Sequence, residues 1–365
     1  MKVPFGDLQR QHLSLMPRLQ EALTRTLTSS GFILGKEVEQ FEQEFAAILK
    51  CRFVIGCSNG TDALILALRA LGVGPGDEVI TVSNTFFATT EAIFAVGASP
   101  VFVDISMKTG LMDVSLVERS ISTKTKAILP VHLYGHPVEM EPLLELCKKH
   151  ALFCIEDAAQ AAGAFYKGIP AGTIAQLGAF SFYPGKNLGA LGDAGAVVTN
   201  DESLAKTIRL YRDHGRTEKY IHLKIASNMR MDGLQAAFLR EKLPYLSQWC
   251  LRRREIADRY FKELSEVPGV TLLSNSSDVV NAYHLFVILC TKRDEIRERL
   301  RDRGVECGIH YPVGCHQQPA LQGIKAALPV TEKFSSQCLS LPIFPEMTDA
   351  ECGYVCEMVR EVAAQ

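Results

Sequence analysis

Short runs of apolar, β-forming residues alternate with helical patterns along the middle of the chain. The strand-like runs cover residues 53–57, 78–82, 101–105, 127–131, 152–156, 179–183 and 196–199. Between them, apolar residues recur at helical spacing over residues 61–71, 89–96, 114–120 and 138–150. This alternation predicts βαβ units and a largely parallel sheet. Because no long helical pattern separates the last two runs, we expect one strand to be antiparallel.

The first fifty residues are predicted to be helical, since Phe41, Phe45, Ala46 and Ile48 recur at helical spacing among Glu and Gln. Residues 29–35 form an apolar loop that contains two glycines and precedes this helix. An exposed apolar loop is typical of a lid or an interface arm, and packing of this loop on the core is an equal alternative.

The last third of the chain predicts a second, smaller α+β domain. A long helical pattern over residues 232–260 contains Pro244, which should kink or break it. Strand-like runs follow at residues 270–273, 283–290 and 305–309, with helices near residues 294–303 and 348–363. We therefore expect a large domain of residues 1–240, with an N-terminal helical arm, and a small domain of residues 241–365.

Composition narrows the classes of protein that remain. The 365 residues carry 39 Lys and Arg against 41 Asp and Glu, so no basic excess supports binding to nucleic acid. Eleven cysteines never form C-x-x-C, which predicts free thiols in a reducing compartment and no zinc site. The apolar runs are too short to cross a bilayer, and residues 1–7 show no signal peptide. We expect a soluble, cytoplasmic protein.

The segment Gly56-Cys-Ser58-Asn-Gly60 leads from a predicted strand into a predicted helix. Its G-x-S-x-G spacing matches the nucleophile elbow of serine hydrolases, although the chain has no HGG-type oxyanion loop. A second interpretation is an anion cradle formed by Gly60, the Thr61 hydroxyl and the N–H groups that open the helix. A plain turn with capping side chains is a third, and the residues alone leave all three open.

Two further residues stand where a ligand could reach them. Asp157 ends an apolar strand, and ligands of open α/β sheets bind beyond the carboxyl ends of strands. Lys186 lies in a glycine-rich turn among small and aromatic residues. Such surroundings lower the pKa of a lysine and favour Schiff-base chemistry. A salt-bridged acid and an exposed turn lysine are the structural alternatives.

An anion cradle, an acid at a strand end and a sheltered lysine together match the needs of pyridoxal phosphate. The cradle takes its phosphate, the acid keeps its pyridine nitrogen protonated, and the lysine holds its aldehyde. The separation of 29 positions between Asp157 and Lys186 allows the two to lie on neighbouring strands.

The chain resembles the fold-type I pyridoxal phosphate enzymes, and more narrowly the sugar aminotransferases of the DegT/DnrJ/EryC1/StrS family. The resemblance covers nearly the whole chain. It is carried by Ser58-Asn-Gly-Thr-Asp-Ala-Leu64, Pro75-Gly-Asp-Glu-Val-Ile80, Asn84-Thr-Phe-Phe-Ala-Thr89, His132-Leu-Tyr-Gly-His-Pro137, Glu156-Asp-Ala-Ala-Gln160, Ser181-Phe-Tyr-Pro-Gly-Lys-Asn-Leu-Gly189, Asp213-His-Gly215, Asn228-Met-Arg-Met-Asp232 and His310-Tyr-Pro312. It implies an aspartate-aminotransferase-like α/β large domain with a mostly parallel mixed sheet.

The resemblance also implies roles for individual residues. Lys186 would form the Schiff base and move protons, and Asp157 would pair with the pyridine nitrogen. The remaining cofactor contacts would be Gly60, Thr61, Phe86, Gln160 and Ser181, together with Asn228 from the neighbouring subunit of a homodimer. Substrate contacts would be Tyr183, Arg230, His310 and Tyr311. No metal is implied.

The implied reaction transfers an amino group from L-glutamate to a nucleotide-linked oxo-sugar, and the cofactor alternates with its pyridoxamine form. The product is an amino sugar for a surface polysaccharide, such as lipopolysaccharide or O-antigen, or for a glycoside. The sequence around Lys186 resembles that of enzymes acting on dTDP- or UDP-linked 3-oxo sugars, and a 4-oxo sugar is the alternative. Family dehydratases carry His in place of the lysine, and a non-catalytic regulatory relative would have lost Lys186 or Asp157.

Overall fold

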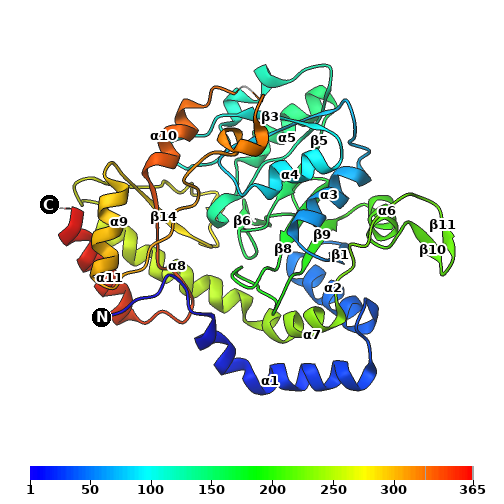
Figure 1. The fold of residues 1–365 in the computed structure, drawn as a ribbon, viewed down its shortest axis with the longest axis horizontal. Coiled ribbons are helices and arrows are strands. Elements are labelled where there is room, and N and C mark those ends of the chain that lie inside the picture. Colours follow the sequence, from blue (N-terminus) through cyan, green and yellow to red (C-terminus); the bar gives the residue numbers. More distant parts are fainter. Residues whose placement is uncertain (325, 364–365) are drawn as a thin grey trace.

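A computed structural model describes residues 1–324 and 326–363. Its centre is a seven-stranded sheet (Figure 1), and the strand order is β1-β9-β8-β5-β4-β2-β3. The strands are β1 (Phe53–Cys57), β2 (Glu78–Val82), β3 (Ser99–Val103), β4 (Thr125–Ile128), β5 (Phe153–Asp157), β8 (Leu177–Ser181) and β9 (Gly195–Thr199). Within the described residues of this sheet only β9 runs antiparallel to its neighbours, which confirms the predicted α/β class and the single reversed strand.

Helices bury both faces of this sheet. Successive side chains of a strand point to opposite faces, so Val197 of β9 joins one apolar cluster and Val198 the other. The first cluster packs the sheet against α3 (Gly60–Ala70), α4 (Ala88–Ala95), α5 (Met140–His150) and α6 (Glu202–Arg212). The second packs it against α2 (Gly35–Leu49) and α7 (Gly233–Lys242), and α1 (Leu8–Ser29) lies outside α7. This layering leaves the carboxyl ends of the parallel strands free to form a site.

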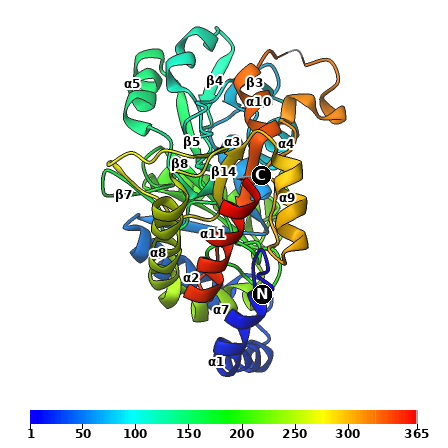
Figure 2. The same cartoon turned by 90° about the vertical axis from the view of Figure 1, so that its left-hand side faces the viewer.

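A separate apolar cluster forms around a three-stranded sheet, β12-β14-β15. Its elements are β12 (Val270–Leu272), β14 (Phe286–Cys290) and β15 (Cys338–Leu341), covered by α8 (Leu246–Leu264), α9 (Arg293–Asp302) and α11 (Asp349–Ala363) (Figure 2). This arrangement agrees with the α+β composition expected for the last third of the chain. The predicted domain boundary at residue 240 falls within α7 and stays a prediction.

Several local predictions differ from the structure. Residues 305–309 form only isolated bridges, Val305 to Val3 and Gly308 to Ser340, because no continuous strand lies beside them. Residues 114–120 form two short 3-10 turns in place of a helix. The sequence reasoning also missed α6, β15, α10 (Pro329–Gln337), the small strands β6 (Phe165–Tyr166), β7 (Ile169–Pro170) and β13 (Val279–Val280), and a hairpin of β10 (Arg216–Glu218) and β11 (Ile221–His222). The missed strands have two to four residues and pair only through tertiary contacts. The missed helix α6 has eleven residues and buries Ala205, Ile208 and Arg212 at helical spacing, a pattern that the prediction overlooked.

The structure also tests two other local predictions, the break at Pro244 and the loop of residues 29–35. Pro244 lies in a 3-10 turn that separates α7 from α8, so the predicted break is confirmed. In the apolar loop before α2, Phe32 and Ile33 keep about half of their surface exposed (47% and 52%), whereas Leu34 packs against the second apolar cluster, so the loop is only partly packed on the core. No helix in the described ranges is long and apolar enough to span a bilayer.

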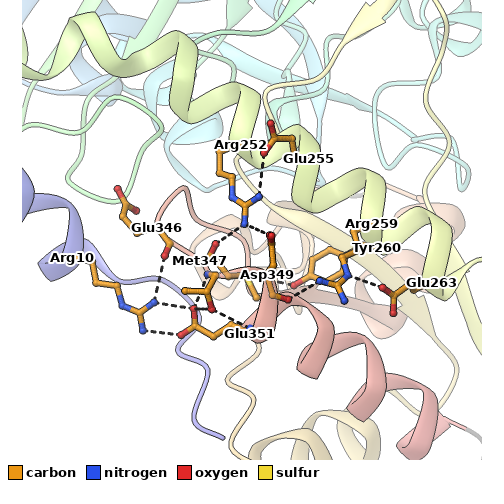
Figure 3. Close-up of polar contacts among 11 residues, drawn as sticks. Arg10, Arg252, Glu255, Arg259, Tyr260, Glu263, Glu346, Met347, Asp349 and Glu351 are labelled. Carbon is orange, nitrogen blue, oxygen red and sulfur yellow. Dashed lines mark hydrogen bonds and ion pairs between the residues drawn. The ribbon is translucent and has the colours of Figure 1, made fainter.

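Ion pairs attach the N-terminal segment and α8 to the start of α11 (Figure 3). Arg10 donates to both carboxylate oxygens of Glu351, at 2.9 and 2.8 Å. Arg252 on α8 donates to the Asp349 carboxylate at 2.6 Å and to the Met347 carbonyl at 2.9 Å. The residues before Arg10 are thereby held in place, and Phe5, Gly6 and Asp7 among them line a pocket.

Candidate active site

A pocket of about 1340 Å³ opens at the carboxyl ends of β5 and β8. This is the edge where open α/β sheets bind their ligands. Ten of the twelve residues that the sequence singled out line it: Gly60, Thr61, Phe86, Asp157, Gln160, Ser181, Tyr183, Lys186, His310 and Tyr311. Residues more than two hundred positions apart in the chain therefore meet in one cavity.

Lys186 ends a tight turn that begins at Tyr183, within the loop of residues 182–194 that joins β8 to β9. Its N–H donates to the Tyr183 carbonyl at 2.8 Å, and Gly189 closes the turn, where an added Cβ would lie 2.2 Å from the Pro184 carbonyl oxygen. Burial lowers the pKa of the Lys186 amine to about 8, and the nearby charge of Asp157 opposes that shift. Part of the lysine population is therefore neutral near pH 7, as a nucleophilic amine must be.

Asp157 is the last residue of β5, the strand beside β8, and only 5% of its surface is exposed. One carboxylate oxygen accepts from the Thr89 hydroxyl at 2.8 Å, and the other accepts from the Ala159 N–H at 3.1 Å. Burial raises the pKa of Asp157, while Thr89, Ala159 and Lys186 act against that shift. The acid is fixed in orientation and faces the pocket, as the cofactor hypothesis requires.

The fully buried Glu156 anchors the end of β5 beneath this acid. Its two oxygens accept from the backbone N–H groups of Gly172, Ile174 and Ala175, each at 2.7 Å. The His132 ring lies 2.8 Å from the same carboxylate. Hydrogen bonds to a buried carboxylate are among the stronger ones in proteins, so they fix the strand end that presents Asp157.

Gly60 and Thr61 open α3 directly against Ser181 at the end of β8. Asn59 caps the helix and accepts from the Asp62 N–H at 2.8 Å. A Cβ added to Gly60 would lie 2.7 Å from the Ser181 Cβ, so only glycine permits this approach. The result is a helix N-terminus, a glycine and hydroxyls on one wall of the pocket. That set of donors fits a phosphate group.

The geometry does not support the serine-hydrolase alternative. The Ser58 hydroxyl contacts the Asp62 carboxylate, and no histidine contacts it among the described residues. Ser58 also lacks the positive φ expected of a strained elbow. The segment Gly56–Gly60 therefore serves as the turn into α3.

Aromatic residues also line the cavity. Phe86 keeps 59% of its surface exposed, and its ring centre lies 6.0 Å from that of Tyr311. Gln160 accepts from the Tyr134 N–H at 2.6 Å and donates to the Tyr311 hydroxyl at 3.3 Å. An exposed aromatic face beside an ordered amide fits a flat ring with a hydroxyl substituent, such as that of pyridoxal phosphate.

His310 and Tyr183 complete the part of the pocket assigned to substrate. His310 stacks on Phe5 with ring centres 5.5 Å apart, and its Nδ1 lies 2.8 Å from the Ser340 hydroxyl. Burial lowers the pKa of His310 to about 4, so the ring is neutral at pH 7. Tyr183 is 59% exposed and free to meet a ligand.

Asn228 and Arg230 do not reach this pocket. Both residues come after the β10–β11 hairpin in the chain. Arg230 donates to the Asp213 carboxylate at 3.0 Å, and the backbone of Asn228 forms an antiparallel bridge with that of Asp213. Asn228 is exposed. If they contact a ligand in this pocket, they must do so from another copy of the chain.

The sequence reasoning missed other residues at the pocket, among them Arg253, His284 and Glu346. Arg253 belongs to the run Arg252-Arg253-Arg254, which is typical of a solvent-exposed helix face. No local pattern marks His284 or Glu346, because tertiary packing alone brings them to the cavity.

The comparisons with known proteins agree with this geometry. The DegT/DnrJ/EryC1/StrS aminotransferase family matches residues 14–360. The chain is 44% identical over 365 residues to dTDP-3-amino-3,4,6-trideoxy-alpha-D-glucose transaminase of Streptomyces venezuelae, covering 99% of this chain and 96% of the relative. It is 46% identical over 358 residues to the erythromycin biosynthesis sensory transduction protein EryC1 of Saccharopolyspora erythraea, covering 97% and 98%. The crystal structure of S. venezuelae DesV in complex with a ketimine intermediate superposes with a TM-score of 0.98 at 44% identity, covering 100% and 99% of the two chains.

Proposed function

Because the chain belongs to the DegT/DnrJ/EryC1/StrS aminotransferase family and is a pyridoxal phosphate-dependent sugar aminotransferase, we propose that it aminates a nucleotide-linked 3-oxo hexose with L-glutamate as donor. The observation that carries the proposal is the meeting of Lys186, Asp157 and the Gly60–Ser181 wall in one pocket. The 3-amino product named for the S. venezuelae relative supports the 3-oxo assignment. The turn sequence around Lys186 supports it as well.

The residues of the pocket fit the cofactor in a consistent way. Gly60, Thr61 and Ser181 would hold its phosphate, and Phe86 would stack on its ring. Gln160 would meet the ring hydroxyl. When bound, pyridoxal phosphate supplies an electron sink that stabilises a carbanion at the donor's α-carbon. The Asp157 carboxylate would sustain that sink through a charged hydrogen bond to the pyridine nitrogen.

Lys186 would hold the cofactor's aldehyde and then act as the base of the reaction. With a pKa of about 8, its amine can take a proton from the donor's α-carbon near neutral pH and give one up again. In the second half-reaction it would deliver the proton to the sugar carbon from one face. Lys186→Ala should abolish turnover and the visible absorbance of the lysine-bound cofactor. Retained turnover in Lys186→Ala would disprove this role.

The sugar would lie against Tyr183, His310 and Tyr311. To identify it, the enzyme is first converted to its pyridoxamine form with L-glutamate. It is then mixed with dTDP- and UDP-linked 3-oxo and 4-oxo sugars. Return of the visible absorbance with 3-oxo sugars supports the proposal, and return with 4-oxo sugars alone would refute the regiochemistry.

A homodimer with shared active sites is part of the proposal. The β10–β11 hairpin exposes large apolar residues, with Tyr220 at 79%, Leu223 at 61% and Ile225 fully exposed, as expected of a surface that a second copy covers. The same hairpin leads to Asn228 and Arg230, which lie outside their own chain's pocket.

Subunit mixing tests this arrangement. Inactive Lys186→Ala protein is mixed with an inactive Asn228→Ala, Arg230→Ala double variant. Hybrid dimers then contain one site with Lys186, Asn228 and Arg230 all intact, so activity should return in the mixture. A mixture that stays inactive although hybrids form would contradict shared sites.

A regulatory role is the second candidate, because one close relative is named as a sensory transduction protein. The presence of both Lys186 and Asp157 favours catalysis, since a protein that catalyses no reaction would need neither residue. The eleven free cysteines support a reducing, cytoplasmic location. The amino sugar would serve a surface polysaccharide or a glycoside.

A further inference from the structure

Arg253 of α8 lines the pocket and is 6% exposed, yet half of its guanidinium group has no partner. Its Nη1 donates to the carbonyls of Ile343 at 2.8 Å, Tyr283 at 3.1 Å and His284 at 3.3 Å. Nε is buried without a hydrogen bond, and Nη2 has none within the described part of the chain. Nη1 is therefore anchored, and Nη2 is the guanidinium nitrogen left to meet a ligand in the pocket.

The charges around the pocket make this unpaired cation unusual. Lys186 and Arg253 are the only lysine and arginine among the described residues that line the pocket, against the acids Asp7, Asp62, Glu91, Asp157, Asp193, Glu306 and Glu346. Burial lowers the pKa of Arg253 to about 10, so the group is still charged at pH 7. A buried charge that forms no ion pair is costly, which is a reason to expect an anionic ligand there.

His284 places Arg253 close to the reacting lysine. The His284 ring lies 3.3 Å from the side-chain oxygen of Asn187, the neighbour of Lys186, while its carbonyl accepts from Arg253. His284 thus contacts both the Arg253 guanidinium and the turn that carries Lys186. An arginine N–H without another partner can donate to a carboxylate oxygen in a charged hydrogen bond.

We propose that Arg253 binds one carboxylate of the amino donor, an inference that rests on the proposed function. Glu346 lines the same part of the pocket, where burial raises its pKa and its charge acts on Arg253. Glu346 would oppose a second anion, so the site should take a single carboxylate more readily than a diphosphate. Arg253 and Glu346 together would set the affinity for the donor.

The test is calorimetric titration of the cofactor-loaded enzyme with glutarate, which has the carboxylates of glutamate but no amine. Arg253→Gln should weaken glutarate binding about tenfold or more, the usual effect of losing a charged hydrogen-bonded pair. The nucleotide-sugar KM and cofactor retention should be unchanged. Unaltered glutarate affinity, or a loss confined to the nucleotide sugar or the cofactor, would overturn the inference.

Arg252→Gln is the matched control, since Arg252 occupies the preceding position of α8 but pairs with Asp349 and Glu255 outside the pocket (Figure 3). It should leave glutarate affinity unchanged, and an equal loss in both variants would count against a specific role for Arg253.

Glu346→Gln supplies a test that keeps Arg253 in place, in case Arg253→Gln does not fold. Removing the opposing charge should strengthen glutarate binding, and unchanged or weaker binding would overturn the inference. The proposed function fails separately, if the unmodified enzyme aminates no nucleotide sugar. Glutarate affinity that depends on Arg253 in such an enzyme would still establish the carboxylate site.

Discussion

The pKa of Lys186 predicts how fast the cofactor-free protein takes up pyridoxal phosphate at each pH. Only the neutral amine attacks an aldehyde, so the rate should follow the neutral fraction. At the ordinary pKa of 10.5, about one lysine in three thousand is neutral at pH 7. At a pKa of about 8, about one in ten is neutral, a gain of roughly 300-fold.

Stopped-flow absorbance after mixing apo-protein with pyridoxal phosphate measures this rate. The rate should rise about tenfold per pH unit below pH 8 and level off above it. A rate that keeps rising tenfold per unit between about pH 8 and 10 would show an ordinary lysine and refute the reasoning.

Asp157→Asn extends this test, because the Asp157 charge raises the pKa of Lys186 against the effect of burial. Removing that charge should move the break in the pH profile to a lower pH. Glu91→Gln is the control, since Glu91 is exposed, lines the same pocket and is not among the charges that act on Lys186. A break that moves upward in Asp157→Asn, or equally in both variants, would show that Asp157 does not act on the lysine as described.

Three further predictions concern cofactor binding and stability. Gly60→Ala should abolish cofactor retention on gel filtration, because its Cβ would lie 2.7 Å from that of Ser181; normal retention would contradict the predicted cradle. Glu156→Gln should lower the free energy of unfolding by about 3 kcal/mol, since an amide group would face backbone N–H donors; an unchanged urea midpoint would argue against this anchor. Lys186→Met should stabilise the apo-protein by about 3 kcal/mol at pH 7. The folded state depresses the lysine pKa, so this gain should shrink as pH rises from about 8 towards 10.5, and urea unfolding at two pH values checks it.

Local pattern predicted most of the large sheet and the centre of the site. The alternation of apolar strands and amphipathic helices predicted the α/β class. The absence of a long helix between the last two strand-like runs predicted one antiparallel strand, and the structure identifies it as β9. Lys186, Asp157 and Gly60 stood out because each is chemically unusual at its place: a lysine among glycines, an acid ending an apolar strand, and a glycine at a helix start. Short segments such as residues 305–309 were assigned wrongly because a strand depends on a neighbour that the local sequence does not specify.

The sequence by itself determined which groups this protein can use, and tertiary structure decided which of them meet. Asn228 and Arg230 belong to the same motif, yet the hairpin holds them away from their own chain's pocket. Arg253 gave no signal within a run of three arginines, and it became a candidate only when α8 turned it toward the cavity and three carbonyls anchored its Nη1. The pKa of Lys186 was likewise expected in direction, but its extent arises from burial and from the distance to Asp157. Both are properties of how β5, β8 and the loop after β8 pack together, which local sequence does not specify.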